Sequence, residues 1–392
     1  MIYLAGVILI VYAASLLGLF YCLWQTLRLL RSNKSLQMVR SGGHRRPSLD
    51  IVVPVKDEED NVGQCIESLL AQDYRQARII VVNDRSSDGT ARVVQAIQDR
   101  HPEVCRIDIE ELPDGHYGKP HALHCIADKL QGDCVAFVDS DLVLDRACLA
   151  TLVDHLESNR LDWVAAMGAP KIPGFWERLI VPLFGAVVFA WYDPRKISDP
   201  EWDGALGSGL MVCRRNSYES IGGHGAVIDI YDEDSELIRI AKRSGQRVSF
   251  VMTPELYTQR HYGTLSNTIH GITRTFAGGV NTIPGLLFTM HAINFVSILP
   301  VVLLILLSLA ALSNWTVPWA AVWWLAAWLH LLVATGLAWV VYHTAQQNPR
   351  WALLHPIGSA FLIAICVRAI IQLKRGTPFT WRGTVHARKL PK

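Results

Sequence analysis

Acidic side chains follow three apolar runs in the first third of the chain. They are Asp57 and Glu58 after residues 49–55, Asp84 after residues 78–82, and Asp139 and Asp141 after residues 134–138. A single acidic residue there commonly caps a turn, but three such positions favour a shared ligand site. In Asp139-Ser140-Asp141, two carboxylates two residues apart can hold one hard divalent cation together with the oxygens of a diphosphate.

The elements that would position these carboxylates predict an α/β fold. The apolar runs Leu49 to Val55, Arg78 to Val82 and Cys134 to Val138 are short and rich in β-branched residues. Helical patterns separate them, from Val62 to Ala71, from a Ser86-Ser87-Asp88 cap through Asp99, and around His121 to Lys129. Alternating strands and helices predict a mostly parallel sheet with ligands at the carboxyl ends of its strands.

Long uncharged stretches at both ends predict membrane helices. Ile2 to Leu27 contains no charged residue, and about 20 apolar residues suffice to cross a bilayer. This run is too long for the core of a cleaved signal peptide, and no basic residue precedes it. Thr275 to Pro349 is also uncharged and predicts spans near residues 293–312 and 318–342. Residues 351–373 form a third candidate, which gives two to three C-terminal transmembrane helices.

The charges divide the chain into the same parts. All 35 acidic residues lie between Asp50 and Glu255, where the net charge is −14, whereas the two flanks together carry +16. This pattern excludes a single soluble globule and a nucleic-acid-binding domain with a global basic face. Six basic residues between Arg28 and Arg46 predict that the acidic part is cytosolic, on an integral protein of a bacterial inner membrane or its equivalent.

The basic C-terminal tail leaves the membrane topology open. Three C-terminal crossings would place it outside, against the tendency of basic segments to remain in the cytosol. Either that tendency fails here or one apolar segment is re-entrant. Residues 175–191 predict a further apolar helix, which is either interfacial or part of the core of the soluble domain.

Six motifs carry a family resemblance between Ser48 and Gly279. They are VPVKDEEDNVGQCIESLLAQDY, VVNDRSSDGT, GKPHAL, FVDSDLVL, GSGLMVCRR and DEDSELIRIAKRSG. In this order they resemble glycosyltransferase family 2, the inverting nucleotide-sugar enzymes of GT-A fold. The terminal membrane segments are most similar to the branch of ceramide-glucosyltransferase-like and hopanoid-associated enzymes. This implies an anchor at 1–30, a cytosolic Rossmann-like GT-A domain at 48–280, a membrane region at 281–373 and a basic tail at 374–392.

The resemblance implies roles for individual residues of this chain. Asp57 or Glu58, with Asp84, would contact the nucleotide base and ribose, and Lys119 would lie near the donor phosphates. Gly207 and Gly209 would allow a close approach of the backbone beside the sugar. Asp234 would be the general base, which takes a proton from the acceptor hydroxyl. His261 would bind the metal or phosphate, Arg260 the phosphate, and Arg274 the phosphate or acceptor.

The resemblance also implies a reaction and its rivals. A Mn²⁺ or Mg²⁺ ion would assist transfer of a sugar from a nucleotide donor, most simply a uridine diphosphate sugar, with inversion. Thr275 replaces the Trp that processive synthases use at the acceptor site, which favours a single transfer to a lipid-like acceptor. A processive polysaccharide synthase is the nearest alternative. A sugar nucleotidyltransferase lacks support because VPVKDEED has no glycine-rich signature, and an inactive membrane scaffold is disfavoured by the intact acidic positions.

Overall fold

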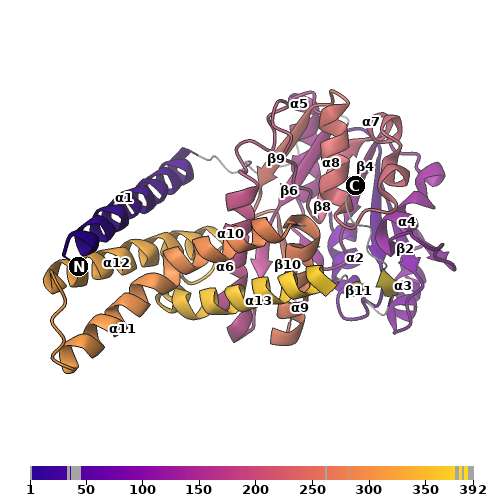
Figure 1. Cartoon of the computed structure of the whole chain (residues 1–392). Helices are drawn as coiled ribbons and strands as arrows, with labels where there is room; N and C mark the ends of the chain where they lie inside the picture. The colour runs from indigo at the N-terminus through magenta and orange to yellow at the C-terminus, as the bar shows by residue number, and fades with distance from the viewer. Residues whose placement is uncertain are drawn as a thin grey trace. The chain divides into compact units, whose positions relative to one another are not determined.

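The computed structural model describes residues 2–32, 36, 46–260, 263–280, 282–375, 379–381 and 384–386. The chain divides into two compact units (Figure 1). The sheet unit comprises residues 35–171, 189–261 and 377–392. The helical unit comprises residues 1–34, 172–188 and 262–376.

A seven-stranded sheet forms the centre of the sheet unit, with strand order β3-β2-β1-β4-β8-β6-β9. The strands are β1 (Leu49–Val55), β2 (Ala77–Asp84), β3 (Val104–Ile109), β4 (Cys134–Val138), β6 (Trp163–Met167), β8 (Leu210–Arg214) and β9 (Val248–Met252). All adjacent pairs are parallel except the two that involve β8. The prediction of a mostly parallel α/β sheet is therefore confirmed.

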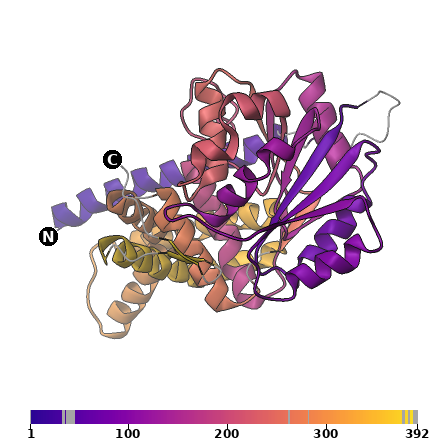
Figure 2. The ribbon, with the colours of Figure 1, turned by 90° about the vertical axis from the view of Figure 1, so that its right-hand side faces the viewer.

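Helices cover both faces of this sheet because its strands are apolar on both sides (Figure 2). On one face Ile51 and Val53 pack against α2 (Val62–Leu70), α3 (Thr90–Gln98) and α5 (Cys148–Ser158). On the other face Val52 and Val82 belong to the core formed with α4 (Gly118–His124), α7 (Arg215–Ser220) and α8 (Glu233–Arg243). Helices α4 and α8 therefore lie on the same face of the sheet.

A small sheet extends the carboxyl-end edge of the main one. Its order is β5-β10-β7, with β5 (Leu142–Leu144), β10 (Tyr257–Arg260) and β7 (Ala169–Lys171). The Asp-Ser-Asp turn is anchored on both sides, because β4 ends directly before Asp139 and β5, which pairs with β10, starts directly after Asp141. Near the C-terminus, β11 (Phe379–Trp381) and β12 (Thr384–His386) form an antiparallel pair.

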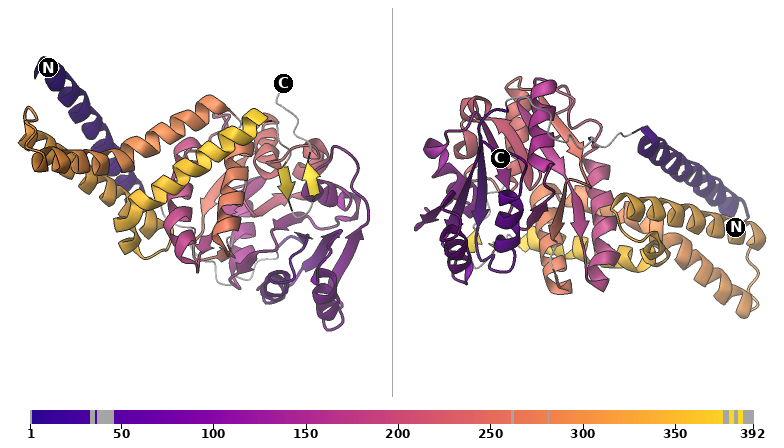
Figure 3. Two further views of the ribbon diagram at one scale, coloured as in Figure 1. Left: turned by 60° about the horizontal axis from the view of Figure 1, so that its bottom comes forward. Right: turned by 180° about the vertical axis from the view of Figure 1, so that it is seen from behind.

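The helical unit consists mainly of apolar helices (Figure 3). Its members are α1 (Ile2–Ser32), most of α6 (Phe175–Trp191), α9 (Leu265–Thr275), α10 (Ile283–Ile293), α11 (Leu299–Leu312), α12 (Ala320–Thr344) and α13 (His355–Arg375). Two π-helical turns, η3 (Phe276–Val280) and η4 (Asn294–Ile298), and the 3₁₀ turn η5 (Pro349–Leu354) connect them.

Three helical segments are long and apolar enough to cross a membrane. They are Ile283–Leu312, Ala320–Thr344 and Pro349–Arg375. The prediction of two to three such C-terminal helices is confirmed. Helix α1 contains a shorter apolar stretch, Ile10–Tyr21, among its described residues.

Candidate active site

The carboxyl ends of β1, β2 and β4 meet at one edge of the main sheet. Their parallel register places the acidic residues that follow β1 and β4 at the same edge as Asp84, the last residue of β2. This edge also receives the N-terminal turns of α4 and α8 from one face of the sheet. The predicted carboxylates are thereby brought close to a lysine and to two further carboxylates.

Lys119, in the first turn of α4, joins three carboxylates from two other elements. Its Nζ lies 2.9 Å from Oδ1 of Asp139, 2.9 Å from Oε1 of Glu233 and 3.1 Å from Oδ2 of Asp234. The Lys119 side chain is only 21% exposed, so water screens these ion pairs weakly. We call these four residues the lysine cluster.

Burial shapes the electrostatics of the lysine cluster. Burial alone would lower the pKa of Lys119, but the surrounding carboxylates outweigh it and raise that pKa well above its usual value. Burial and the negative charge of Glu233 raise the pKa of Asp234 well above the usual aspartate value, against the opposing effect of Lys119. Asp234 is thus a stronger base than an exposed aspartate, the direction that suits proton transfer near neutral pH.

Gly207 permits the approach that places Asp234 in this cluster. A Cβ on Gly207 would overlap the backbone and Cβ of Asp234. The Gly207 N–H also donates to Oγ of Ser235 at 3.1 Å, which ties the loop before β8 to the first turn of α8. Close backbone approach is the property for which glycine was predicted here, and the approached residue is the candidate base.

Replacing Gly207 with alanine is expected to push the start of α8 away from Lys119. We expect transfer to fall at least about tenfold, because displacements of about 1 Å cost large rate factors, and the unfolding midpoint to fall as well. Initial-rate assays and thermal unfolding measure both. Gly63→Ala is the matched control, because Gly63 lies within α2 and its added Cβ would make only an ordinary 3.5 Å contact. Equal rates for the two variants would contradict this role of Gly207.

Gly209 plays the corresponding part beside the Asp-Ser-Asp turn. A Cβ on Gly209 would lie 2.7 Å from Oδ2 of Asp139. The Asp139 N–H donates to the Gly209 carbonyl at 2.8 Å, which fixes the turn against β8. Both predicted glycines therefore border acidic residues of the site.

Asp139 and Asp141 provide an incomplete cation site with excess negative charge. Burial, together with repulsion from Asp139 and Glu58, raises the pKa of Asp141 to about 7. Gln259 of β10 donates to the Asp141 carboxylate at 3.3 Å. Within the described ranges no group of three His, Cys, Asp or Glu side chains is placed to hold a metal ion, and position 261 lies outside those ranges. The two aspartates therefore fit a divalent cation that takes its other ligands from a bound molecule or solvent.

The predicted nucleotide-binding carboxylates are held by the loops around them. Asp57, which has a positive φ of 52°, accepts hydrogen bonds from the backbone N–H of Ser87 at 2.7 Å and from its hydroxyl. Asp84 is buried and forms a two-pronged ion pair with Arg85. A Cβ on Gly118 would lie 2.5 Å from Oδ2 of Asp84, so the start of α4 packs directly on this carboxylate. Their nucleotide contacts remain predictions.

Glu58 and Arg260 are linked through one asparagine. Asn61 Nδ2 donates to Glu58 at 2.7 Å, and Arg260 Nη1 donates to Asn61 Oδ1 at 3.0 Å. The Arg260 backbone N–H also donates to the Asp141 carbonyl at 3.0 Å. Arg260 thus lies beside the Asp-Ser-Asp turn, where a phosphate role remains a prediction. The His261 prediction falls on a residue outside the described part, and Arg274 lies in α9 of the helical unit.

Several participants in these contacts were not among the predicted site residues. Glu233 joins the lysine cluster, Arg85 pairs with Asp84, and Gln259 donates to Asp141. Glu233 and Arg85 are next to the predicted residues Asp234 and Asp84 in the sequence, and this position was the one indication that they belong to the site. Gln259 had no comparable signal because its role depends on the pairing of β10 with β5.

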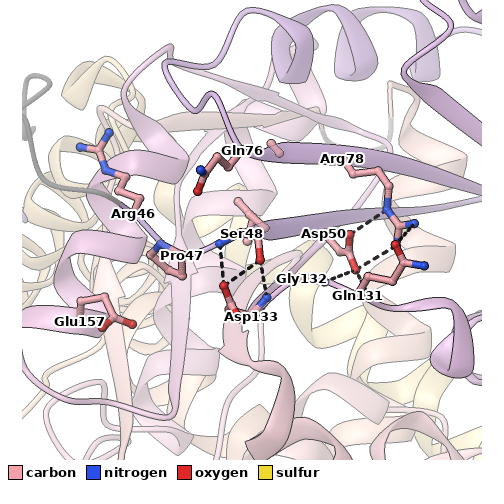
Figure 4. A pocket seen from close by; sticks show the side chains of 12 residues that line it. Arg46, Pro47, Ser48, Asp50, Gln76, Arg78, Gln131, Gly132, Asp133 and Glu157 are labelled. Carbon is pink, nitrogen blue, oxygen red and sulfur yellow. Dashed lines mark hydrogen bonds and ion pairs between the residues drawn. The ribbon is translucent and has the colours of Figure 1, made fainter.

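A pocket of about 770 Å³ lies at the opposite, amino-terminal end of the strands (Figure 4). Most of its polar groups already have partners: Arg78 pairs with Asp50, and Ser48 hydrogen-bonds to Asp133. Gln131 and Gly132 donate backbone N–H groups to the same Asp50 carboxylate. These contacts tie β1, β2 and the start of β4 together, so we assign the pocket a structural role.

The comparisons with known proteins agree with this geometry. Residues 50–221 match the family described as Glycosyl transferase family 2. The chain is 31% identical over 112 residues to 4,4'-diaponeurosporenoate glycosyltransferase of Staphylococcus aureus, and 25% identical over 114 residues to Glycosyltransferase GlyA of Streptococcus pneumoniae. These matches cover 28% and 29% of this chain but only 28% and 16% of the relatives' own lengths.

A solved structure extends the fold comparison to nearly the whole chain. It is the mannosyltransferase PcManGT of Pyrobaculum calidifontis in complex with GDP-Man and Mn²⁺, with a TM-score of 0.54 and 20% sequence identity. The likeness covers 93% of this chain and 98% of that one. It supports the expected GT-A fold. Residues 50–221 of the present chain therefore resemble a glycosyltransferase family 2 domain, and the sheet unit that contains them carries the lysine cluster at the carboxyl-end edge of a GT-A sheet.

Proposed function

We propose that this protein is a membrane-bound inverting glycosyltransferase. It moves one sugar from a nucleotide-diphosphate sugar, most simply a uridine diphosphate sugar, to a hydroxyl group of a lipid-like acceptor. The observation that carries the proposal is the lysine cluster, in which Lys119 contacts both a carboxylate of the Asp-Ser-Asp turn and the candidate base Asp234. The candidate cation ligand Asp139 and the candidate base Asp234 thus contact the same ammonium group.

The proposed transfer is a single displacement. The acceptor oxygen forms a bond to the anomeric carbon while the bond from that carbon to the diphosphate oxygen breaks, and its electron pair leaves with the diphosphate. The acceptor proton passes to a carboxylate oxygen of Asp234. Because the oxygen attacks opposite to the leaving group, an α-linked donor yields a β-glycoside.

Residues of the sheet edge divide the remaining tasks. Lys119 offers positive charge to the diphosphate, and Asp57, Glu58 and Asp84 would accept hydrogen bonds from the base and ribose. Asp139 and Asp141 would hold a divalent cation, which when bound supplies further positive charge beside the leaving diphosphate. Arg260, from its place beside Asp141, would reach phosphate oxygens.

The lipid-like acceptor and the location rest on the helical unit. Its three long apolar segments supply a membrane environment in the same chain, where a hydroxyl-bearing lipid would be concentrated. The basic residues between α1 and β1 favour a cytosolic sheet unit. Nucleotide sugars are expected on that side, so donor and acceptor meet where the membrane borders the cytosol.

Removal of divalent metal is expected to abolish transfer, and Mn²⁺ or Mg²⁺ should restore it. Asp141→Asn, which removes one predicted ligand, should raise the metal concentration for half-maximal rate by at least about tenfold. Titration of metal into chelator-treated membranes gives this value. Asp128→Asn, at an exposed aspartate of the same domain, is the matched control. Full activity in excess chelator would refute the metal assignment.

The proposed reaction is tested with membranes that contain the full-length chain. They would be incubated with separate labelled nucleotide sugars, and lipid extracts would be analysed by mass spectrometry. We expect one sugar to be added to a lipid, with the label absent from Asp234→Asn membranes. Long saccharide chains would instead indicate a processive synthase, and no transfer from any donor would contradict the proposal.

A further inference from the structure

Helix α13 is apolar enough to cross the membrane, yet its neighbours within the helical unit indicate a different path. Its candidate span is Pro349–Arg375. If this segment crossed, the basic C-terminal residues would emerge on the side opposite to the sheet unit. The direction of each helix within the helical unit decides between these topologies.

Helix α1 runs parallel to α12, and both begin at the same end of the unit. Gly6 packs against the ring of Trp319, which directly precedes α12. Farther along, the Tyr12 hydroxyl hydrogen-bonds to Nδ1 of His330 at 2.7 Å, and Leu23 contacts Gly336. The end marked by Gly6 and Trp319 is therefore the amino-terminal end of α1. The chain enters the sheet unit only beyond the opposite end of α1.

Helices α11 and α12 form an antiparallel hairpin that turns at this same end. The turn, residues 313–319, joins the last residue of α11 to the first of α12. The continuous segment Ile283–Leu312 contains 30 residues and α12 contains 25, or about 45 and 37 Å at 1.5 Å per residue. Both lengths exceed the hydrocarbon thickness of about 30 Å, so each arm of the hairpin can cross fully.

Helix α13 starts deep in this bundle and runs away from the hairpin turn (Figures 1 and 3). Its first residue, His355, hydrogen-bonds to Ser297 of η4 and lies 3.3 Å from Oγ1 of Thr335 in α12. Nearer the C-terminal end of α13, Arg368 contacts Nε2 of His270 at 2.9 Å. His270 belongs to α9, the first helix after the sheet unit. Thus α13 proceeds from the level of residue 297 back towards residue 270.

Contacts along α13 hold it in this direction. Gly358 is closely packed on the backbone carbonyl of Leu179 in α6, where any Cβ would overlap that oxygen. The Tyr342 hydroxyl, near the end of α12, donates to the same Leu179 carbonyl at 2.9 Å. The missing N–H of Pro182 leaves the neighbouring carbonyl of Arg178 without its helical donor, so Tyr342 adds an outside donor next to this interruption of α6.

The surface of α13 fits the boundary between lipid and water. Ile357, Val367 and Ile371 are exposed apolar side chains, while Arg368, Lys374 and Arg375 supply positive charge. These basic residues lie in the C-terminal half of α13, and basic residues at the end of an apolar helix suit anionic headgroups at the membrane surface.

We propose that α13 does not cross the membrane but runs out of the bundle and ends as an interfacial helix at the cytosolic surface, and that only α1, the α10–α11 segment and α12 cross the membrane. The N-terminus and the α11–α12 turn then lie outside, whereas the sheet unit and the basic tail lie inside. This topology removes the conflict between three C-terminal apolar segments and a basic tail. It is independent of which sugar or acceptor the protein uses.

Epitope tags in the full-length chain test the sidedness. One tag is inserted at Asn314 in the α11–α12 turn, one follows Lys392, and a control tag at Gly115 marks the sheet unit. In intact spheroplasts, antibody should bind only the Asn314 tag, and permeabilisation should expose the other two. Binding to the C-terminal tag in intact spheroplasts would overturn the proposal, whether or not the protein transfers sugar.

Depth measurements test the interfacial position separately. A fluorescent amino acid is placed at Ile371 of α13 or at Leu309 of α11, both of which are exposed. In vesicles of lipids brominated at known depths, Ile371 should be quenched most strongly by bromines near the headgroups and Leu309 by deeper ones. Equal deep quenching at both positions would overturn the interfacial assignment.

Discussion

Replacing Lys119 with methionine is expected to reduce sugar transfer at least about 100-fold, the scale seen when one preorganised electrostatic contact to a developing charge is lost. Methionine keeps much of the side-chain volume but removes the positive charge that Asp139, Glu233 and Asp234 share. The three carboxylates would then repel one another, and the diphosphate would lose the positive charge that we propose Lys119 offers it. Initial rates at saturating and limiting donor measure the loss.

The same variant should show how much the lysine cluster contributes to folding stability. Removing one partner from a largely buried ion cluster costs about 3 kcal/mol of folding free energy. We expect the unfolding midpoint of Lys119→Met to fall and to recover partly on addition of Mn²⁺, because a cation at Asp139 would again offset the negative charge. This recovery can be measured without any substrate.

Lys129→Met provides the control for Lys119→Met, because Lys129 is an exposed lysine that follows α4. Its rate and unfolding midpoint should remain close to those of the unaltered protein. If Lys119→Met behaved in the same way, the lysine cluster would have no part in either donor binding or folding. The proposed function would then lose the observation on which it mainly rests.

The sequence predicted β1, β2 and β4 well because their burial leaves a strong pattern. The predicted runs 49–55 and 134–138 coincide with β1 and β4, whose residues are almost all buried. The strand β3 was not predicted, since VCRIDI at the sheet edge mixes buried and partly exposed positions. Two-sided burial produces continuous apolar runs, whereas an edge strand lacks them.

The individual carboxylates were also predictable, but their common partner was not. Motif order and strand ends indicated Asp139 and Asp234 separately. Both contact Lys119 because α4 and α8 lie on the same face of the sheet. Lys119 and Asp234 are 115 positions apart in the sequence, so the motifs alone do not reveal this contact. The close approach at Gly207 has the same origin, because only the folded chain brings residue 207 against residue 234.

Hydropathy alone does not predict the membrane topology of the C-terminal helices. Apolar composition identifies α13 as a candidate span equally with α12. It does not encode the direction of α13, which is set by specific polar contacts such as His355 with Ser297 and Arg368 with His270. Within a bilayer such contacts are stronger determinants of helix packing than apolar burial, which lipid also provides.

Asp234→Asn is expected to lower the turnover number on the order of 100- to 10,000-fold, the contribution of a general base. Asparagine has nearly the same size and cannot accept the acceptor proton at neutral pH. The donor site would keep Asp84, Asp139 and Asp141, so the donor concentration for half-maximal rate should change by less than about threefold. Steady-state kinetics with the lipid acceptor separate these two effects.

A neighbouring residue of α8 gives the control for this prediction. Glu236 is also acidic and near the start of α8, but it pairs with Arg239 rather than Lys119. Glu236→Gln should therefore retain most of the transfer rate, which separates the loss of a base from a general loss of negative charge at this helix. A folded Asp234→Asn protein with the rate of Glu236→Gln would exclude Asp234 as the base. In that case Glu233, which contacts the same Lys119, would be the next carboxylate to test.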